Sequence, residues 1–336
     1  MATRIDDPKL SPENLAAWLD AEGIRFFKLG VFDVDGILRG KYVHREKFLS
    51  VVAKGLGFCD VVLGWDSNDQ LYDNTTASGW HTGYRDAPVE LDLTTLRKLP
   101  HEADTVLVTG NFVGDYADVC PRQALKRQAA KAAEMGYVAH AAVEYEFFLF
   151  EETPHSAREK GYRNLKPWTP GMFGYSVLRN SVHADLYQQI LDMAERMDFP
   201  IEGIHTETGP GVLEAAIAVD CVSNAADKAA LFKTFMKVLA ERNGLMATFM
   251  AKWSNDYPGQ SGHIHISLTH RDSTESAFYD PDQPHGMSLI QRQFLAGQQR
   301  LMPEFLSLIA PTVNSYSRLV PDFWAPTDAT WGIDNR

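Results

Sequence analysis

Residues 143–150 (VEYEFFLF) place two glutamates inside an otherwise apolar and aromatic stretch. Side chains alternate between the two faces of a β-strand, so Glu144 and Glu146 point to the same side and their apolar neighbours to the other. Two carboxylates this close repel each other unless a cation lies between them. The stretch therefore predicts either a divalent-cation site on a sheet or a solvent-facing strand edge.

A second acidic segment, residues 205–214 (HTETGPGVLE), carries Glu207 and Glu214 on either side of a Gly-Pro-Gly turn. Such a turn can bring both carboxylates near one point, because glycine permits close backbone approach. The alternative interpretation is a surface hairpin with charged ends, which is the more common case for a lone pattern of this kind.

A histidine-containing strand is predicted at residues 263–268, behind the glycine-rich loop 259–262 (GQSG). His263, His265 and Ser267 alternate with Ile264 and Ile266, so the polar residues share one face and the isoleucines are expected to face a core. A lone histidine there would more often be a satisfied core residue. Two histidines and a serine on one face favour a functional site.

Two arginines near the end of the chain complete the set of polar candidates. Arg318 lies in NSYSR (314–318) and Arg336 ends WGIDNR (331–336). Arginine binds carboxylate and phosphate well because it is planar and permanently charged, although a single arginine is more often a surface ion-pair partner. Four carboxylates, a histidine and two arginines together indicate Mg²⁺ or Mn²⁺, an anionic substrate and a phosphate.

The pattern of apolar residues predicts an α+β chain with a strand-rich domain at 1–114 and a larger domain at 115–336. The formal net charge of −12 argues against a nucleic-acid footprint. No apolar run reaches membrane-spanning length and no signal peptide is recognised, so a cytoplasmic protein is the default expectation. Three widely spaced cysteines indicate neither a zinc cluster nor a disulfide framework.

Several ordered segments together resemble the glutamine synthetase family: DLTTLRKLP, CPRQALKR, EYEFFLF, ETGPGVLE, ATFMAKW, SGHIHISL, NSYSRL and WGIDNR. The resemblance spans most of the chain. It implies an N-terminal β-grasp domain and a catalytic domain with a curved antiparallel sheet and flanking helices. It also implies a homo-oligomer of stacked rings, dodecamer-like in size, with active sites between neighbouring subunits.

The resemblance also implies roles for individual residues. One metal ion would be bound by Glu146, Glu207 and Glu214, and a second, which holds the ATP phosphates, by Glu144 and His263. The remaining assignments are Gly259 and Arg318, together with Glu146, for glutamate, Arg336 for the transferred phosphate, and His265, Ser267 and Glu202 for the nucleotide. In the implied reaction, the γ-carboxylate of glutamate attacks the γ-phosphate of ATP, and an amine then displaces phosphate from γ-glutamyl phosphate.

Two departures from the family pattern concern the residues that would bind the amine. Ammonia-using members carry a glutamate after the NSYxRL segment that deprotonates ammonium, and Trp324 stands in its place. An indole accepts no proton, but it can cover an alkylamine or stack near a cation. Ammonia-using members also bind ammonium with an aspartate before a Gly-Trp pair. Here Asp60 is displaced from the best register, which puts Cys59 at that position.

The resemblance therefore predicts a glutamate–amine ligase that uses a polyamine or alkylamine. An ammonia-dependent glutamine synthetase and a non-catalytic ring protein are the alternatives. A third departure is that the family normally continues beyond the point where this chain stops, so a fragment of a longer protein is a further interpretation.

Overall fold

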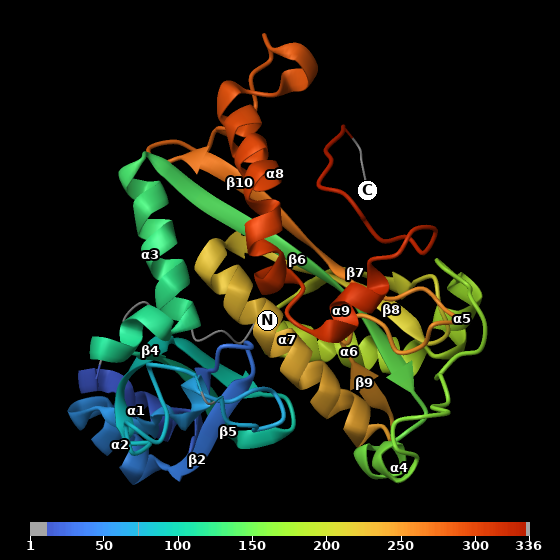
Figure 1. Ribbon diagram of the computed structural model, residues 1–336. Coiled ribbons are helices and arrows are strands. Elements are labelled where there is room, and N and C mark those ends of the chain that lie inside the picture. Colours follow the sequence, from blue (N-terminus) through green and yellow to red (C-terminus); the bar gives the residue numbers. More distant parts are fainter. Residues whose placement is uncertain (1–11, 73, 334–336) are drawn as a thin grey trace. The chain divides into compact units, whose positions relative to one another are not determined.

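The structure is a computed structural model that describes residues 12–72 and 74–333 (Figure 1). Its contacts divide the chain into two units. The first contains the described residues up to Lys131 together with Ile190–Pro200 and Ala226–Thr234, and the second contains the rest. The helices α3 (Pro121–Glu134), α6 (Ala184–Arg196) and α7 (Val222–Arg242) contribute residues to both units. The boundary at residues 114/115 stays a prediction.

The first unit is built on a five-stranded mixed sheet. Its elements are α1 (Pro12–Ala21), β1 (Phe26–Phe32), β2 (Leu38–His44), α2 (Arg45–Lys54), β3 (Leu56–Cys59), β4 (Asp86–Leu99), β5 (Glu102–Phe112) and 3-10 turns at Asp60–Leu63 and Gly114–Val119. The strand order is β2-β1-β5-β4-β3. β1 runs antiparallel to β2 and parallel to β5, which agrees with the predicted β-grasp arrangement.

Apolar residues of α1, α2 and the sheet form one core in this unit. Leu15 and Leu19 of α1 and Phe48 of α2 are fully buried. The ring of Phe48 stacks on that of Phe27 of β1, with centroids 3.8 Å apart. This spacing of apolar residues along α1 is the helical periodicity that buries one face of a helix against a sheet.

The second unit is built on an antiparallel sheet with the order β10-β6-β8-β7, and β9 also pairs with β6. Its strands are β6 (Tyr137–Phe150), β7 (Ile201–Thr206), β8 (Val212–Cys221), β9 (Met246–Thr248) and β10 (Gly262–His270). Its other elements are α4 (Pro154–Glu159), α5 (Val177–Val182), α8 (Leu289–Ile309), α9 (Val313–Arg318) and a 3-10 turn at Pro284–Gly286. The curved antiparallel sheet predicted for the larger domain is therefore present.

The central strand β6 combines a polar face with an apolar end. Its last four residues, 147–150 (FFLF), are fully buried, whereas Glu144 and Glu146 are partly exposed. β8 turns back at Gly211, whose φ is +72°. A Cβ atom there would lie 2.5 Å from the carbonyl oxygen of Leu149. Only glycine fits this position, as the Gly-Pro-Gly pattern predicted.

The strands differ from the apolar pattern of the sequence in three places. β4 was not predicted, because its Asp, Thr, Arg and Lys residues disguise the apolar alternation of its two ends. β9 ends at Thr248, although apolar residues continue to Met250. Ile264 and Ile266 are 68% and 37% exposed rather than in a core, because β10 is an edge strand.

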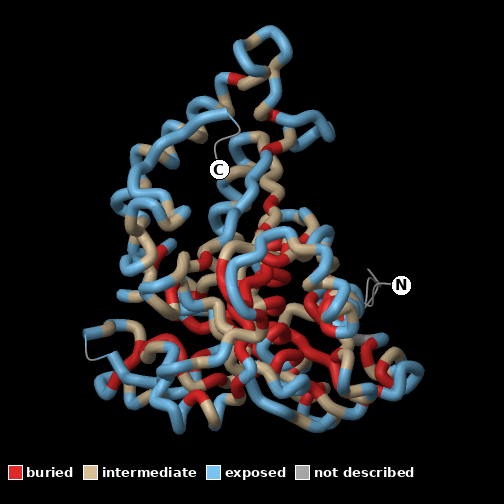
Figure 2. Tube along the Cα trace, turned by 90° about the vertical axis from the view of Figure 1, so that its right-hand side faces the viewer, coloured by how far each residue is buried: buried red, intermediate tan, exposed pale blue. Residues whose placement is uncertain are grey.

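Figure 2 shows the buried residues in red, and most of them lie in strands or in the helices α1, α2, α6 and α7. No helix in the described ranges is both long and apolar enough to cross a membrane.

Candidate functional site

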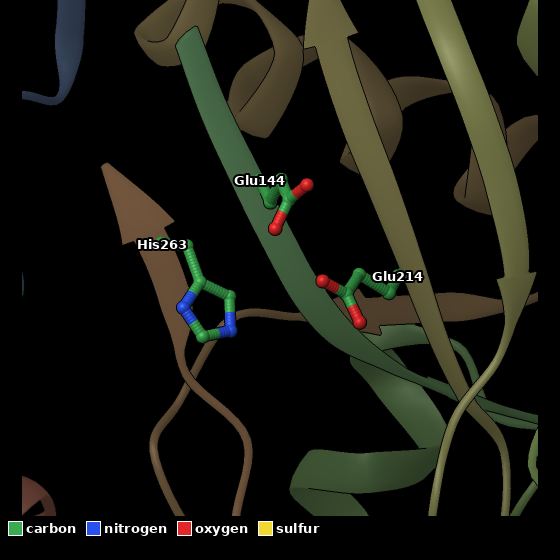
Figure 3. Close-up of side chains that lie close together, drawn as sticks. All are labelled: Glu144, Glu214 and His263. Carbon is green, nitrogen blue, oxygen red and sulfur yellow. The ribbon is translucent and has the colours of Figure 1, made fainter. Parts of the chain in front are cut away.

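Three strands of the second unit bring Glu144, Glu214 and His263 together (Figure 3). The three residues lie on β6, β8 and β10, and each offers one ligand atom within 4.8 Å of the other two. The register explains the convergence, because His263 pairs with Glu144, and Glu214 pairs with Glu146 two residues further along β6. Residues separated by about 120 positions in the sequence thus share one face of the sheet.

A second cluster shares Glu214 and adds His205 and Glu207. The imidazole of His205 lies between the two carboxylates, with Nδ1 3.7 Å from Glu207 Oε1 and Nε2 3.8 Å from Glu214 Oε2. All three side chains are mostly buried, with 31%, 14% and 13% of their surface exposed.

The convergence of carboxylates has an electrostatic cost. Burial, together with the negative charges of Glu146, Glu144 and Glu207, raises the pKa of Glu214 to about 7. Burial also raises the pKa of Glu146, although the backbone N–H of Ser261, which donates to its carboxylate, opposes the rise. A divalent cation would relieve this repulsion, and carboxylate oxygens with one or two imidazole nitrogens suit Mg²⁺ or Mn²⁺.

Arg318 of α9 and Gly259 lie against each other beside Glu146. A Cβ atom on Gly259 would lie 2.3 Å from the carbonyl oxygen of Ala251 and 2.8 Å from Cγ of Arg318, so the loop needs glycine. Burial lowers the pKa of the Arg318 guanidinium, and the charge of Glu146 opposes that shift. The Nε of Arg318 is buried and has no hydrogen-bond partner in the described part of the chain. This guanidinium can therefore still bind an anion.

The proposed nucleotide contacts lie on exposed strand positions. His265 follows His263 on the same face of β10, and its Nε2 lies 3.3 Å from Glu144 Oε2. Ser267 is exposed one step further along β10, and Glu202 is exposed on β7. The structure thus brings His265 to the carboxylates, whereas it records no contact between those carboxylates and Ser267 or Glu202.

Residues 118–336 match the family described as glutamine synthetase, catalytic domain. The match covers more than half of the chain. The chain belongs to the glutamine synthetase family. A type-1 glutamine synthetase 2 of Dictyostelium discoideum is 45% identical over 314 residues, which cover 93% of this chain and 60% of that protein.

More distant members of the glutamine synthetase family also match. A glutamate–isopropylamine ligase of Pseudomonas sp is 33% identical, over 95% of this chain and 70% of that protein. The chain thus spans 60% and 70% of the lengths of these two relatives. The solved structure "Apo GmaS without ligand" has a TM-score of 0.76 at 26% identity and covers 91% of this chain and 68% of that one. These matches confirm the glutamine synthetase-type fold.

The two amine-site candidates of this glutamine synthetase family chain have different surroundings. Trp324 is 84% exposed and adopts a positive φ of +59°. Asp60 is fully buried in the first unit, where its carboxylate accepts hydrogen bonds from the hydroxyls of Tyr116 (3.0 Å) and Ser78 (3.2 Å). Both hydrogen bonds hold Asp60 within its own unit, and its contact with an amine stays a prediction. Arg336 lies outside the described residues.

The two clusters run across the sequence-based grouping of the metal-ligand candidates, and that grouping stays a prediction. Glu214 lies with Glu144 and His263 as well as with Glu207, and Glu146 accepts a hydrogen bond from the backbone N–H of Ser261. Sequence reasoning missed His205. The signal for it was available, because His205 and Glu207 are two residues apart and therefore share one face of an extended segment.

A short loop holds His205 in place. The ring of Tyr175 stacks on the imidazole, with centroids 4.4 Å apart and an interplanar angle of 26°. The backbone N–H of Tyr175 donates to the carbonyl of Thr206 (2.7 Å), and that of Ser176 donates to the Thr206 hydroxyl (2.8 Å). The segment that precedes α5 is therefore fixed to β7 beside the acidic clusters.

Proposed function

We propose that this chain is part of an ATP-dependent ligase that joins the γ-carboxylate of glutamate to an organic amine through γ-glutamyl phosphate. The proposal rests on one observation, the convergence of Glu144, Glu207, Glu214 and His263, with Glu146 beside them, on one face of the sheet. A merely structural sheet gains nothing from such repulsion. Divalent cations held there would neutralise phosphate charge during phosphoryl transfer.

The protein's own groups have distinct roles in this proposal. Glu144, His263 and Glu214 would hold the cation that faces the ATP phosphates, and Glu146 and Glu207 would complete, with Glu214, the cation nearer glutamate. Arg318 and the Gly259 loop would grip the amino-acid part of glutamate. The remaining assignments are His265, Ser267 and Glu202 for the nucleotide and Arg336 for the transferred phosphate.

The choice of an organic amine rests on Trp324. Its indole has no basic atom that could take a proton from ammonium, whereas its exposed ring offers an apolar surface to an alkyl chain. The relative named glutamate–isopropylamine ligase supports this choice. The relative named type-1 glutamine synthetase 2, at 45% identity, favours ammonia as the second candidate substrate.

An amine panel separates the two candidates. The full-length protein is assayed for phosphate release with ATP, Mn²⁺, glutamate and, in turn, ammonium, methylamine, ethylamine, putrescine and spermidine. We expect at least one organic amine to give a higher kcat/KM than ammonium, and Trp324→Glu to reduce that preference. Higher turnover with ammonium in the parent protein would contradict the choice of amine.

Binding measurements address the non-catalytic alternative. Isothermal titration of the full-length protein with Mn²⁺ and with ATP is expected to show binding of both, and Glu214→Gln is expected to weaken Mn²⁺ binding. A protein that binds neither ligand would be a non-catalytic member of the family. We further propose a ring-shaped homo-oligomer with active sites between subunits, which mass photometry of the full-length protein tests.

A further inference from the structure

Lys252 is a buried cation that the proposed reaction does not use. The residue follows β9 in the second unit and is only 5% exposed. Its ammonium lies over the ring of Phe323, with Nζ 4.3 Å from the centroid. Within the described ranges it forms no ion pair and no side-chain hydrogen bond. The negative face of an aromatic ring attracts an ammonium, and the ring of Phe323 is the partner that this structure supplies.

The backbone of Lys252 is fixed to α9. Its N–H donates to Oδ1 of Asn314 over 2.7 Å, and Nδ2 of Asn314 donates back to its carbonyl oxygen. One residue therefore contacts both the start of α9, through Asn314, and the loop that follows α9, through Phe323. The two hydrogen bonds to Asn314 therefore fix the backbone of Lys252 independently of the loop.

The loop at 320–326 adopts a conformation that needs external support. Asp322 and Trp324 both have positive φ, at +66° and +59°. Residues with a Cβ atom reach this region only at a cost of roughly 1–3 kcal/mol each, and they persist where the surroundings hold them. Phe323 between them is half-buried, whereas Trp324 is 84% exposed. The ring of Phe323 is thus the point at which the loop is anchored.

We propose that Lys252 is a positioning residue for the amine: by holding Phe323, it fixes the loop that presents Trp324 to the incoming substrate. This inference rests on the proposed function, because it makes Trp324 part of the amine site. It assigns no reacting atom to Lys252. Its effect is expected on amine recognition, and not on glutamate, ATP or metal binding.

Hydrogen exchange measures the anchor without any turnover. Lys252→Met removes the charge and keeps a long apolar stem, and Phe323→Leu removes the ring. In the full-length protein, each variant is expected to speed amide exchange of the peptide that covers residues 319–326 about tenfold, which corresponds to about 1.4 kcal/mol. Lys252→Arg and Phe323→Tyr should retain parent-like exchange. Lys41→Met is the matched control, because Lys41 lies over the ring of Phe58 in the first unit.

Kinetics then test the effect on the amine. Lys252→Met and Phe323→Leu are each expected to raise the KM for the amine about tenfold and to leave the KM for glutamate and ATP within about twofold. The double variant should be no worse than either single variant, because both remove the same contact. Additive effects, or an equal rise in the KM for glutamate, would overturn the inference.

The two proposals fail in different ways. Loop exchange that is unchanged in both variants would refute the anchor even if the parent protein turns over organic amines. A parent protein that turns over no amine, with loop exchange that responds to both variants, would refute the ligase proposal and leave the anchor intact.

Discussion

Without a bound cation, we expect the ionised form of Glu214 to destabilise the folded chain near and above pH 7. Its pKa is raised to about 7 in the folded chain from an ordinary value of 4.5. A tenfold change in proton affinity corresponds to about 1.4 kcal/mol, so ionisation of Glu214 costs the folded state up to roughly 3 kcal/mol relative to the unfolded state. The folded chain binds the proton more tightly, so stability is highest below pH 4.5. It falls as the pH rises towards 7, and the full penalty applies above pH 7.

Replacing Glu214 by glutamine removes the ionisable group and keeps its size. In EDTA at pH 8, we expect Glu214→Gln to be more stable to urea than the parent chain by up to about 3 kcal/mol, and at pH 4.5 to differ little from it. Glu195→Gln on the exposed side of α6 is the matched control and should show no such pH dependence.

Added Mn²⁺ should close most of this gap in stability. A cation at a hundredfold excess over its dissociation constant stabilises the folded state by about 2.7 kcal/mol, and it should stabilise the parent chain more than Glu214→Gln. The reasoning would be refuted if Glu214→Gln were less stable than the parent chain in EDTA at pH 8. Equal stability differences at pH 4.5 and pH 8 would refute it too, because the carboxylates would then not converge.

Two further substitutions test single contacts in the second unit. Glu152 is buried and pairs with Lys160. Hydrogen bonds, above all the one from Lys160, lower the pKa of Glu152 to about 2. Glu152→Gln should therefore lower the free energy of unfolding in urea by about 1–2 kcal/mol at pH 7. This is less than the full pKa shift implies, because Lys160 is 43% exposed and solvent screens the pair. The loss should vanish as the pH falls from 4.5 to 2, where Glu152 becomes protonated. Gly259→Ala would place a methyl group 2.3 Å from the carbonyl oxygen of Ala251 and 2.8 Å from Cγ of Arg318. The KM for glutamate should therefore rise at least tenfold in steady-state assays. An unchanged KM would exclude this loop from the glutamate site.

The parts of the site that the sequence predicted are those set by strand periodicity. Glu144 with Glu146, and His263 with His265, share a face because side chains alternate along a strand, and the register between β6 and β10 then brings the two strands' polar residues together. The Gly-Pro-Gly turn likewise predicted that Glu207 and Glu214 come near one point. These features are local, and a single sequence contains the information for them.

The features that sequence reasoning missed depend on neighbours that periodicity does not specify. His205 belongs to the second cluster because the register of β7 and β8 places it opposite Glu214. Ile264 and Ile266 alternate as core residues would, yet their strand lies at the edge of the sheet. Alternation tells which residues share a face, but it does not tell whether that face is covered.

The register of β6 links the stability of the sheet to the proposed chemistry. Glu146 pairs with Glu214 on one side, and Glu144 pairs with His263 on the other, so the strand places carboxylates opposite polar partners along both of its edges. A slip of one residue would turn every side chain of the strand over, so Glu144 and Glu146 would exchange faces with the buried Val143 and Phe147. Burial of those apolar residues therefore holds the register against the repulsion of the carboxylates. Under the proposed function, a cation bound at the clusters would remove that repulsion without any change of register.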